Sequence, residues 1–208
     1  MAEEAHKVGI PIFDDVEVLD FCGPFEVFGV TGVRDGPAPF EVFTVAERDV
    51  VRARNGLSIK PHHTLKTCPQ PDILVIPGGG GYHPNGTPFG TRLELDNEIL
   101  LNWIARMSEN AKIVFSVCTG ALLLAKLGML ENQKATTHHL AFDTLAGLEP
   151  SATVLRQRVV DNGKVILSGG ISAGIDASFH IVSRLLGEDA AKETARYMEY
   201  DWPRGSLA

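Results

Sequence analysis

Cys118 is the residue of this 208-residue chain with the best context for a nucleophile. It follows an apolar run over 111–117 and precedes a leucine-rich stretch over 119–127, which predicts a turn between a buried strand and a helix. A sulfur at such a turn points over the carboxyl edge of the sheet, as in the nucleophile elbow of hydrolases. The helix N-terminus is expected to lower the pKa of the thiol. The alternative is a small buried hydrophobe, as most free cysteines are, and the turn alone does not decide between the two.

A cluster of four glycines follows another buried strand, predicted over 72–76. The backbone N–H groups of Gly78, Gly79 and Gly80 have no Cβ atoms beside them, so they can converge on a developing negative charge, as an oxyanion hole requires. The alternative is a flexible loop. A phosphate cradle is disfavoured because no Gly-Lys-Ser/Thr ending follows the glycines.

Asp20 lies among apolar residues after the first predicted strand. Such surroundings raise a carboxyl pKa, so that Asp20 can exchange a proton with a thiol or a substrate. The alternative is a helix cap, since Pro24 follows shortly afterwards. Of the other cysteines, Cys22 is expected on the packed side of this helix and Cys68 in a loop, without a chemical role.

The elements that position these residues alternate between short β-rich runs and longer amphipathic runs. Strands are predicted over 7–13, 40–46, 50–54, 72–76, 111–117, 152–155, 157–160 and 165–168, and helices over 18–30, 95–110, 119–127, 138–146, 172–186 and 189–200. Asp161-Asn162-Gly163-Lys164 predicts a tight hairpin. Strands that are apolar on both faces, between helices, predict a mostly parallel α/β sheet covered on both sides. Ligands of such sheets bind beyond the carboxyl ends of the strands.

Length and composition favour one globular domain over 1–208 with a small-molecule partner. The chain is 44% hydrophobic and 22% charged, as ordinary soluble proteins are. Its net charge of −7 disfavours nucleic-acid binding, which usually needs a basic face. The acidic N-terminus and the lack of an apolar run of about 20 residues predict no signal peptide and no membrane span. Three isolated cysteines suit the reducing cytoplasm.

Five motifs together resemble the ThiJ/PfpI superfamily, a class I glutamine amidotransferase-like group, and within it the isocyanide (isonitrile) hydratases. They are Val18-Leu19-Asp20 with Gly23-Pro24, Ile76-Pro77-Gly78-Gly79, Ser116-Val117-Cys118-Thr119-Gly120, Ala135-Thr136-Thr137-His138 and Gly169-Gly170-Ile171-Ser172-Ala173-Gly174-Ile175-Asp176. The motifs occur in the expected order over nearly the whole chain. The resemblance implies a flavodoxin-like three-layer sandwich and a homodimer in which the Asp20 region lies near the partner subunit.

The resemblance also implies roles for site residues. Cys118 is the nucleophile, with Asp20 within reach of its sulfur. The N–H groups of Gly79 and Thr119 stabilise developing charge, and Ile171 packs beside the sulfur. His138 lies near the cysteine in relatives, although capping of the following helix is an equally weighted alternative. Thr119 stands where some relatives carry the base of a triad, and because it cannot act as a base at neutral pH, peptidase action is disfavoured.

The activity implied is hydration of isocyanides to N-substituted formamides through a thioimidate on Cys118, without a cofactor. His139 and the His62-His63 pair have no carboxylate or cysteine at ligand spacing, so no metal is expected. One alternative is a glyoxalase- or deglycase-like protein, or a stress protein that acts by cysteine oxidation. A ligand-sensing amidase-like domain, of the kind fused to helix-turn-helix regions, is less favoured because the chain is acidic and shows no such region.

Overall fold

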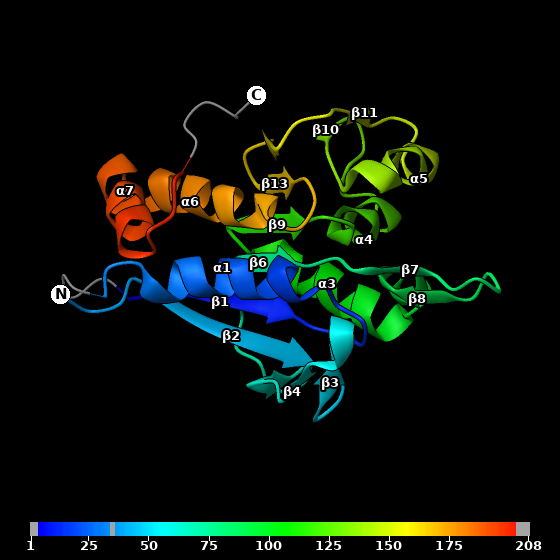
Figure 1. Ribbon diagram of the computed structural model, residues 1–208, viewed down its shortest axis with the longest axis horizontal. Coiled ribbons are helices and arrows are strands. Elements are labelled where there is room, and N and C mark those ends of the chain that lie inside the picture. The colour runs from blue at the N-terminus through cyan, green and yellow to red at the C-terminus, as the bar shows by residue number, and fades with distance from the viewer. Residues whose placement is uncertain (1–3, 34–35, 203–208) are drawn as a thin grey trace.

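A seven-stranded sheet between two layers of helices forms the centre of the computed structural model, which describes residues 4–33 and 36–202 (Figure 1). Its strand order is β12 (Val159–Asp161), β13 (Val165–Ser168), β9 (Ile113–Val117), β6 (Ile73–Ile76), β1 (His6–Pro11), β2 (Phe40–Ala46) and β5 (His63–Thr64). All neighbours pair in parallel except β12, which forms the predicted antiparallel hairpin with β13. The mostly parallel α/β prediction is confirmed.

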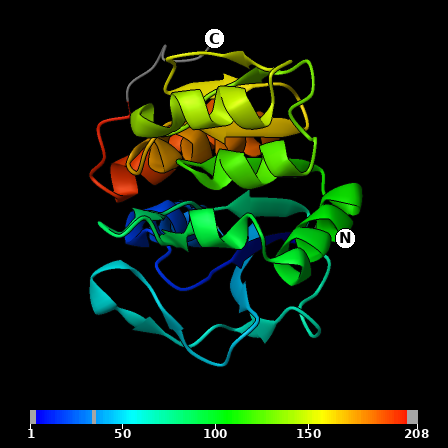
Figure 2. The ribbon, with the colours of Figure 1, turned by 90° about the vertical axis from the view of Figure 1, so that its right-hand side faces the viewer.

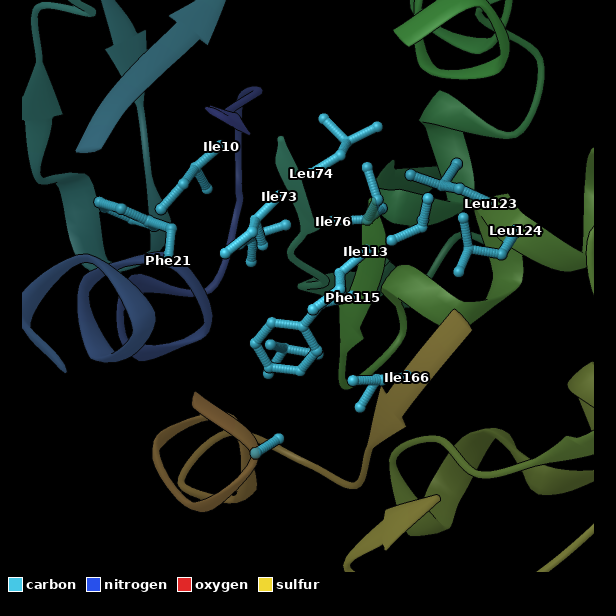
Figure 3. Packing of buried hydrophobic residues seen from close by; sticks show 14 of the residues in the cluster. Ile10, Phe21, Ile73, Leu74, Ile76, Ile113, Phe115, Leu123, Leu124 and Ile166 are labelled. Atoms are coloured by element: carbon cyan, nitrogen blue, oxygen red, sulfur yellow. The ribbon is translucent and has the colours of Figure 1, made fainter. Parts of the chain in front are cut away.

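The central strands β6 and β9 are buried on both faces, which is why their sequences are continuously apolar. In Figure 3, Ile73 and Phe115 point toward α1 (Val18–Val30) and α6 (Ala173–Leu186). On the opposite face, Leu74 and Ile76 lie on the side of α4 (Gly120–Lys126), which contributes Leu123 and Leu124. Burial of one such side chain stabilises the fold by about 1.5–3 kcal/mol. The packed strands therefore hold the loops at their ends in fixed positions.

The helices form one group on each face of the sheet. On one face, α6 packs between α1 and α7 (Glu188–Tyr197). The other face carries α3 (Glu98–Asn110), α4 and α5 (Phe142–Leu148) (Figures 1 and 2). None of the helices in ranges 4–33 and 36–202 is both long and apolar enough to cross a bilayer.

Several predicted elements differ in their bounds for local reasons. The helix expected over 95–110 begins at Glu98, because the Asn97 side chain accepts hydrogen bonds from two N–H groups of the first turn, and a short α2 (Thr91–Glu94) precedes it. The helix expected over 138–146 is a 3-10 turn, η2 (His139–Ala141), followed by α5. The strand expected over 50–54 is only β3 (Val51–Arg52), paired with β4 (Ser58–Ile59) outside the main sheet and followed by η1 (Arg54–Gly56). Residues of the 152–155 strand form β11 (Thr153–Val154), which pairs with β10 (Lys134–Ala135).

A hairpin covers the segment after β6, where no element is predicted. Strand β7 (Gly80–Tyr82) pairs with β8 (Pro88–Gly90), and Gly80 lies opposite Gly90. The flexible-loop alternative for the glycine cluster is therefore wrong at Gly80. In Figure 1, β1 and β2 point toward the side of the molecule where β7, β8 and α4 lie, and Figure 2 views the molecule from that side. The β7–β8 hairpin and the start of α4 thus lie at the carboxyl edge of the sheet.

Candidate active site

Cys118 occupies the sharp turn between β9 and α4 in a left-handed backbone conformation, with φ 57°. Its N–H group donates to the carbonyls of Ser168 and Gly169, at 3.2 and 3.0 Å. Its own carbonyl accepts a 2.8 Å hydrogen bond from the Thr137 hydroxyl. A non-glycine residue in this conformation costs about 1–3 kcal/mol, and these three hydrogen bonds maintain it. Thr137 had no predicted role, although its motif was recognised in the sequence.

Glycines let the end of β6 pack directly on this turn. A Cβ atom at Gly120 would lie 2.0 Å from the Ile76 carbonyl oxygen, and one at Gly78 would lie 2.5 Å from the Thr119 nitrogen. Both distances are far inside van der Waals contact with backbone atoms. Close approach of two backbones therefore explains these two glycines.

Asp20 lies in the first turn of α1, completely buried. Its Oδ2 atom accepts a 3.0 Å hydrogen bond from the N–H group of Gly78, whereas Oδ1 has no conventional hydrogen-bond partner among the described residues. The carboxyl group also interacts with the thiol of Cys118, and each group shifts the pKa of the other. Glu17, not Asp20, occupies the N-cap position of α1, so the capping alternative for Asp20 is wrong.

Burial dominates the protonation of this pair. It raises the pKa of Asp20 to about 7, against the lowering effects of the Gly78 N–H group and of Cys118. It also raises the pKa of the Cys118 thiol to about 12, and the negative charge of Asp20 adds to that increase. The N–H groups of Thr119 and Ile171 lower it by less. The backbone N–H groups at the turn thus do lower the thiol pKa, but the expected net decrease is wrong, because desolvation and the carboxylate outweigh them.

Thr119 uses its side chain to hold the glycine cluster. The N–H group of Gly79 donates to Thr119 Oγ1 at 2.9 Å, and this hydroxyl lies 3.2 Å from the hydroxyl of Thr91. The N–H groups of Gly78 and Gly79 are thus both engaged by side chains, which corrects the expectation of free donors there. The donors that do act on the sulfur are the backbone N–H groups of Thr119 and Ile171.

Ile171 lies beside Cys118 in a second left-handed turn, with φ 51°. This conformation is an outlier for a β-branched residue. The turn packs against His138, because a Cβ atom at Gly170 would lie 2.4 Å from His138 Cδ2. Both His138 and Ile171 therefore belong to the wall around the sulfur.

A cavity of about 290 Å³ opens above Cys118. It is lined by Glu17, Arg54, Gly79, Gly80, Gly81, Arg92, Cys118, Thr119, His138, Leu140 and Ile171. Its walls include most of the predicted site residues, with Asp20 and Gly78 behind them. The charged residues Glu17, Arg54 and Arg92 had no predicted role, because they lie in segments without a recognisable motif.

His138 combines both of the roles weighed for it. Its Nδ1 atom accepts a 3.3 Å hydrogen bond from the Leu140 N–H group and so caps η2, while the ring lines the cavity. Burial lowers the pKa of His138, and the nearby His139 and Arg92 lower it further. The imidazole is therefore neutral at pH 7.

The remaining cysteines lie outside the cavity lining. Cys22 and Cys68 are half-buried, and both pack against the hydrophobic core. Burial raises the pKa of each thiol. In the described part of the chain, no three His, Cys, Asp or Glu side chains are grouped as a metal site would require.

Known proteins share this architecture and part of this sequence. The family model for the DJ-1/PfpI family matches residues 6–184. An isonitrile hydratase from Pseudomonas putida is 32% identical over 94% of this chain and 79% of its own length. The transcriptional regulator CdhR from Pseudomonas aeruginosa is 25% identical over 72% of this chain, but only 42% of its own length is covered.

Solved structures agree with the family match. A ThiJ/PfpI family protein from Pseudomonas syringae superposes with a TM-score of 0.83 and 29% identity, over 97% of this chain and 77% of its own. The match covers β1 to α6, which include every element that contributes to the cavity. From the family model, the sequence identity and the shared fold together, the chain belongs to the DJ-1/PfpI family.

Proposed function

We propose that this protein hydrates isocyanides to N-substituted formamides, with Cys118 as nucleophile and Asp20 as proton carrier. The observation that carries the proposal is the buried contact between the Asp20 carboxyl group and the Cys118 thiol at the base of a small cavity. The 32% identity to an isonitrile hydratase supports the reaction class. The cavity volume of about 290 Å³ favours a substrate of few atoms.

The first step forms a thioimidate. The sulfur of Cys118 bonds to the terminal carbon of R–N≡C as its proton passes to Asp20, and that proton then moves to the same carbon. The product is R–N=CH–S–Cys118, and Asp20 is left as a carboxylate. Since one proton moves between neighbours, the high pKa of the thiol is not an obstacle: the thiolate forms only as it attacks.

The second step adds water. The Asp20 carboxylate takes a proton from a water molecule whose oxygen bonds to the thioimidate carbon, and the nitrogen receives a proton through Asp20. The C–S bond then breaks and its electrons return to sulfur, while the hydroxyl proton of the intermediate passes through Asp20 to that sulfur and R–NH–CHO leaves. Summed over both steps, one water molecule is consumed and the Cys118–Asp20 pair is regenerated.

The test is formation of a formamide from n-butyl isocyanide, followed by NMR. We expect turnover by the unchanged protein and by Cys22→Ser, which alters a cysteine outside the cavity, and none by Cys118→Ala. Absence of formamide above the Cys118→Ala background would contradict the proposal. If mild peroxide instead oxidised Cys118 selectively, as peptide mass spectrometry would show, the cysteine-oxidation alternative would be favoured.

We further propose a cytoplasmic homodimer, an assembly that the family resemblance implies. The charge of −7 and the three unpaired cysteines are compatible with this compartment. A sedimentation experiment should give about twice the chain mass of 22.5 kDa. A single species at the mass of one chain would contradict the dimer.

A further inference from the structure

One of the two arginines that line the cavity forms no ion pair with any described residue. Arg54 lies 3.8 Å from a carboxylate oxygen of Glu17, and its guanidinium group stacks over the Phe89 ring at 5.4 Å. Arg92 forms no ion pair and no hydrogen bond with any residue that the structure describes. The Nε atom of Arg92 is buried, so solvent does not satisfy this donor.

An unpaired guanidinium donor at a cavity wall is costly. Leaving a buried donor unsatisfied costs about 1–3 kcal/mol, and more for a charged group. Native structures rarely retain such groups without a reason. A planar guanidinium group suits a carboxylate especially well, since its N–H groups can donate two parallel hydrogen bonds.

The described residues that line the cavity around Arg92 do not supply an unpaired anion. Glu17 lines the same cavity, but it is paired with Arg54. His138 is close enough for the charge of Arg92 to lower its pKa, and a neutral imidazole neither repels nor replaces an anionic ligand. Among the described residues that line the cavity with the Cys118 sulfur, Arg92 is therefore a cation without an ion-pair partner.

We propose that the substrate carries a carboxylate that binds Arg92 while its electrophilic carbon meets Cys118. For the reaction proposed above, the substrate class is then a small isocyano carboxylate, and this identification of the electrophile rests on the proposed function. Recognition of the anion does not rest on it. The two groups of the substrate must be only a few bonds apart, because the cavity is about 290 Å³.

The first experiment compares isocyanoacetate with its uncharged methyl ester. We expect kcat/KM to be roughly 10- to 100-fold higher for the carboxylate, as a hydrogen bond to a charged group of about 1.5–3 kcal/mol gives. Arg92→Gln should remove this preference, and Arg92→Lys should restore part of it. Arg106→Gln, at an exposed position of α3, is the matched control for loss of one positive charge and should keep the preference.

The second experiment does not require isocyanide turnover. The Cys118 sulfur displaces iodide from iodoacetate, which is anionic, and from iodoacetamide, which is neutral. The ratio of the two alkylation rates, measured at the Cys118 peptide by mass spectrometry, should exceed the ratio for free glutathione. It should fall about tenfold in Arg92→Gln but not in Arg106→Gln.

The outcomes separate the two proposals. If the alkylation ratio is the same with and without Arg92, the anion site is overturned, whatever the hydration assay gives. If the ratio depends on Arg92 but neither isocyanide is hydrated, the anion site stands and the proposed function fails. An intermediate ratio of alkylation rates in Arg92→Lys excludes misfolding as the cause of the lower ratio in Arg92→Gln. Lysine retains the positive charge but lacks the planar guanidinium group.

Discussion

Asp20 and Cys118 control each other's protonation. Burial disfavours both charged forms, the negative charge of Asp20 raises the pKa of the Cys118 thiol further, and the hydrogen bond with the thiol lowers the pKa of Asp20. Between about pH 7 and about pH 12 the pair therefore holds a single proton, and the two positions of that proton are tautomers of one state. Activity that needs this state should rise with pH through about 7.

Replacing Asp20 by Asn should separate the effect of the carboxylate charge on the thiol pKa from the effect of burial. Loss of the carboxylate removes one of the two main causes of the high thiol pKa, so the pKa of Cys118 should fall below about 12. Hydration should nevertheless drop by roughly 10²- to 10⁴-fold, because the proton carrier is gone. The pH dependence of iodoacetamide alkylation at Cys118 measures the first effect. An unchanged midpoint would show that the carboxylate does not act on the thiol.

The sequence predicts some residues of the site better than others. Asp20 and Cys118 stand in recognisable motifs, and the structure brings them together from α1 and the end of β9. The direction of the thiol pKa was not predictable, because it depends on the depth of burial, which many distant residues determine together. Arg92 could not be predicted either, since its segment has no hydrophobic period.

At the scale of elements, the site depends on how closely the end of β6 approaches the start of α4. The two backbones meet at Gly120 and Gly78, where no Cβ atom fits. The same contact brings the Gly78 N–H group to Asp20 and the Gly79 N–H group to Thr119. A change in this contact therefore disturbs the proton carrier and the nucleophile together.

Gly120→Ala should destabilise the fold by about 3 kcal/mol or more, since the added methyl group meets the Ile76 carbonyl at 2.0 Å and overpacking moves backbone. Gly147→Ala is the matched control in α5, where no atom lies within 4 Å of the new Cβ atom. It should be neutral or stabilising by up to about 1 kcal/mol, from helix propensity. Urea unfolding measures both. Equal effects would contradict the importance of the contact.

Elements were predictable where burial leaves a regular pattern. Strands β6 and β9 are apolar at every position because both faces are covered, and the Asp161–Lys164 turn marks the β12–β13 hairpin. The β7–β8 hairpin was missed, because its glycines, prolines and exposed residues show no alternation. The short strands β3 and β11 likewise depend on tertiary contacts and show no regular hydrophobic pattern. Their bounds were therefore predicted only approximately.

For the whole molecule, the raised pKa of Asp20 makes stability depend on pH. The unfolded chain loses this proton near 3.8, the ordinary value, whereas the folded chain keeps it to about 7. Below about pH 4 both states are protonated, and this stabilising contribution is fully present. It is lost as pH rises through about 7, because the folded state must then bury a carboxylate.

Asp20→Asn should therefore gain stability relative to the unchanged protein as the pH rises. The asparagine cannot ionise, so the difference in unfolding free energy between pH 4 and pH 8 should be up to roughly 4 kcal/mol in its favour. Urea unfolding of both proteins at the two pH values measures this difference, and other titrating groups cancel in the comparison. A difference that is the same at pH 4 and pH 8 would mean that Asp20 titrates near its ordinary value.

The cavity wall also bears on how the protein can be redesigned. Gly79, Gly80 and the neighbouring turn at Cys118 lie in backbone contact with other segments, so no larger side chain fits at the two glycines. Leu140 lines the same cavity from its mouth and is 79% exposed. The wall is thus closed to larger side chains at these two glycines and open to them at Leu140. A library directed at larger substrates would start at Leu140, where size can change without a cost in folding.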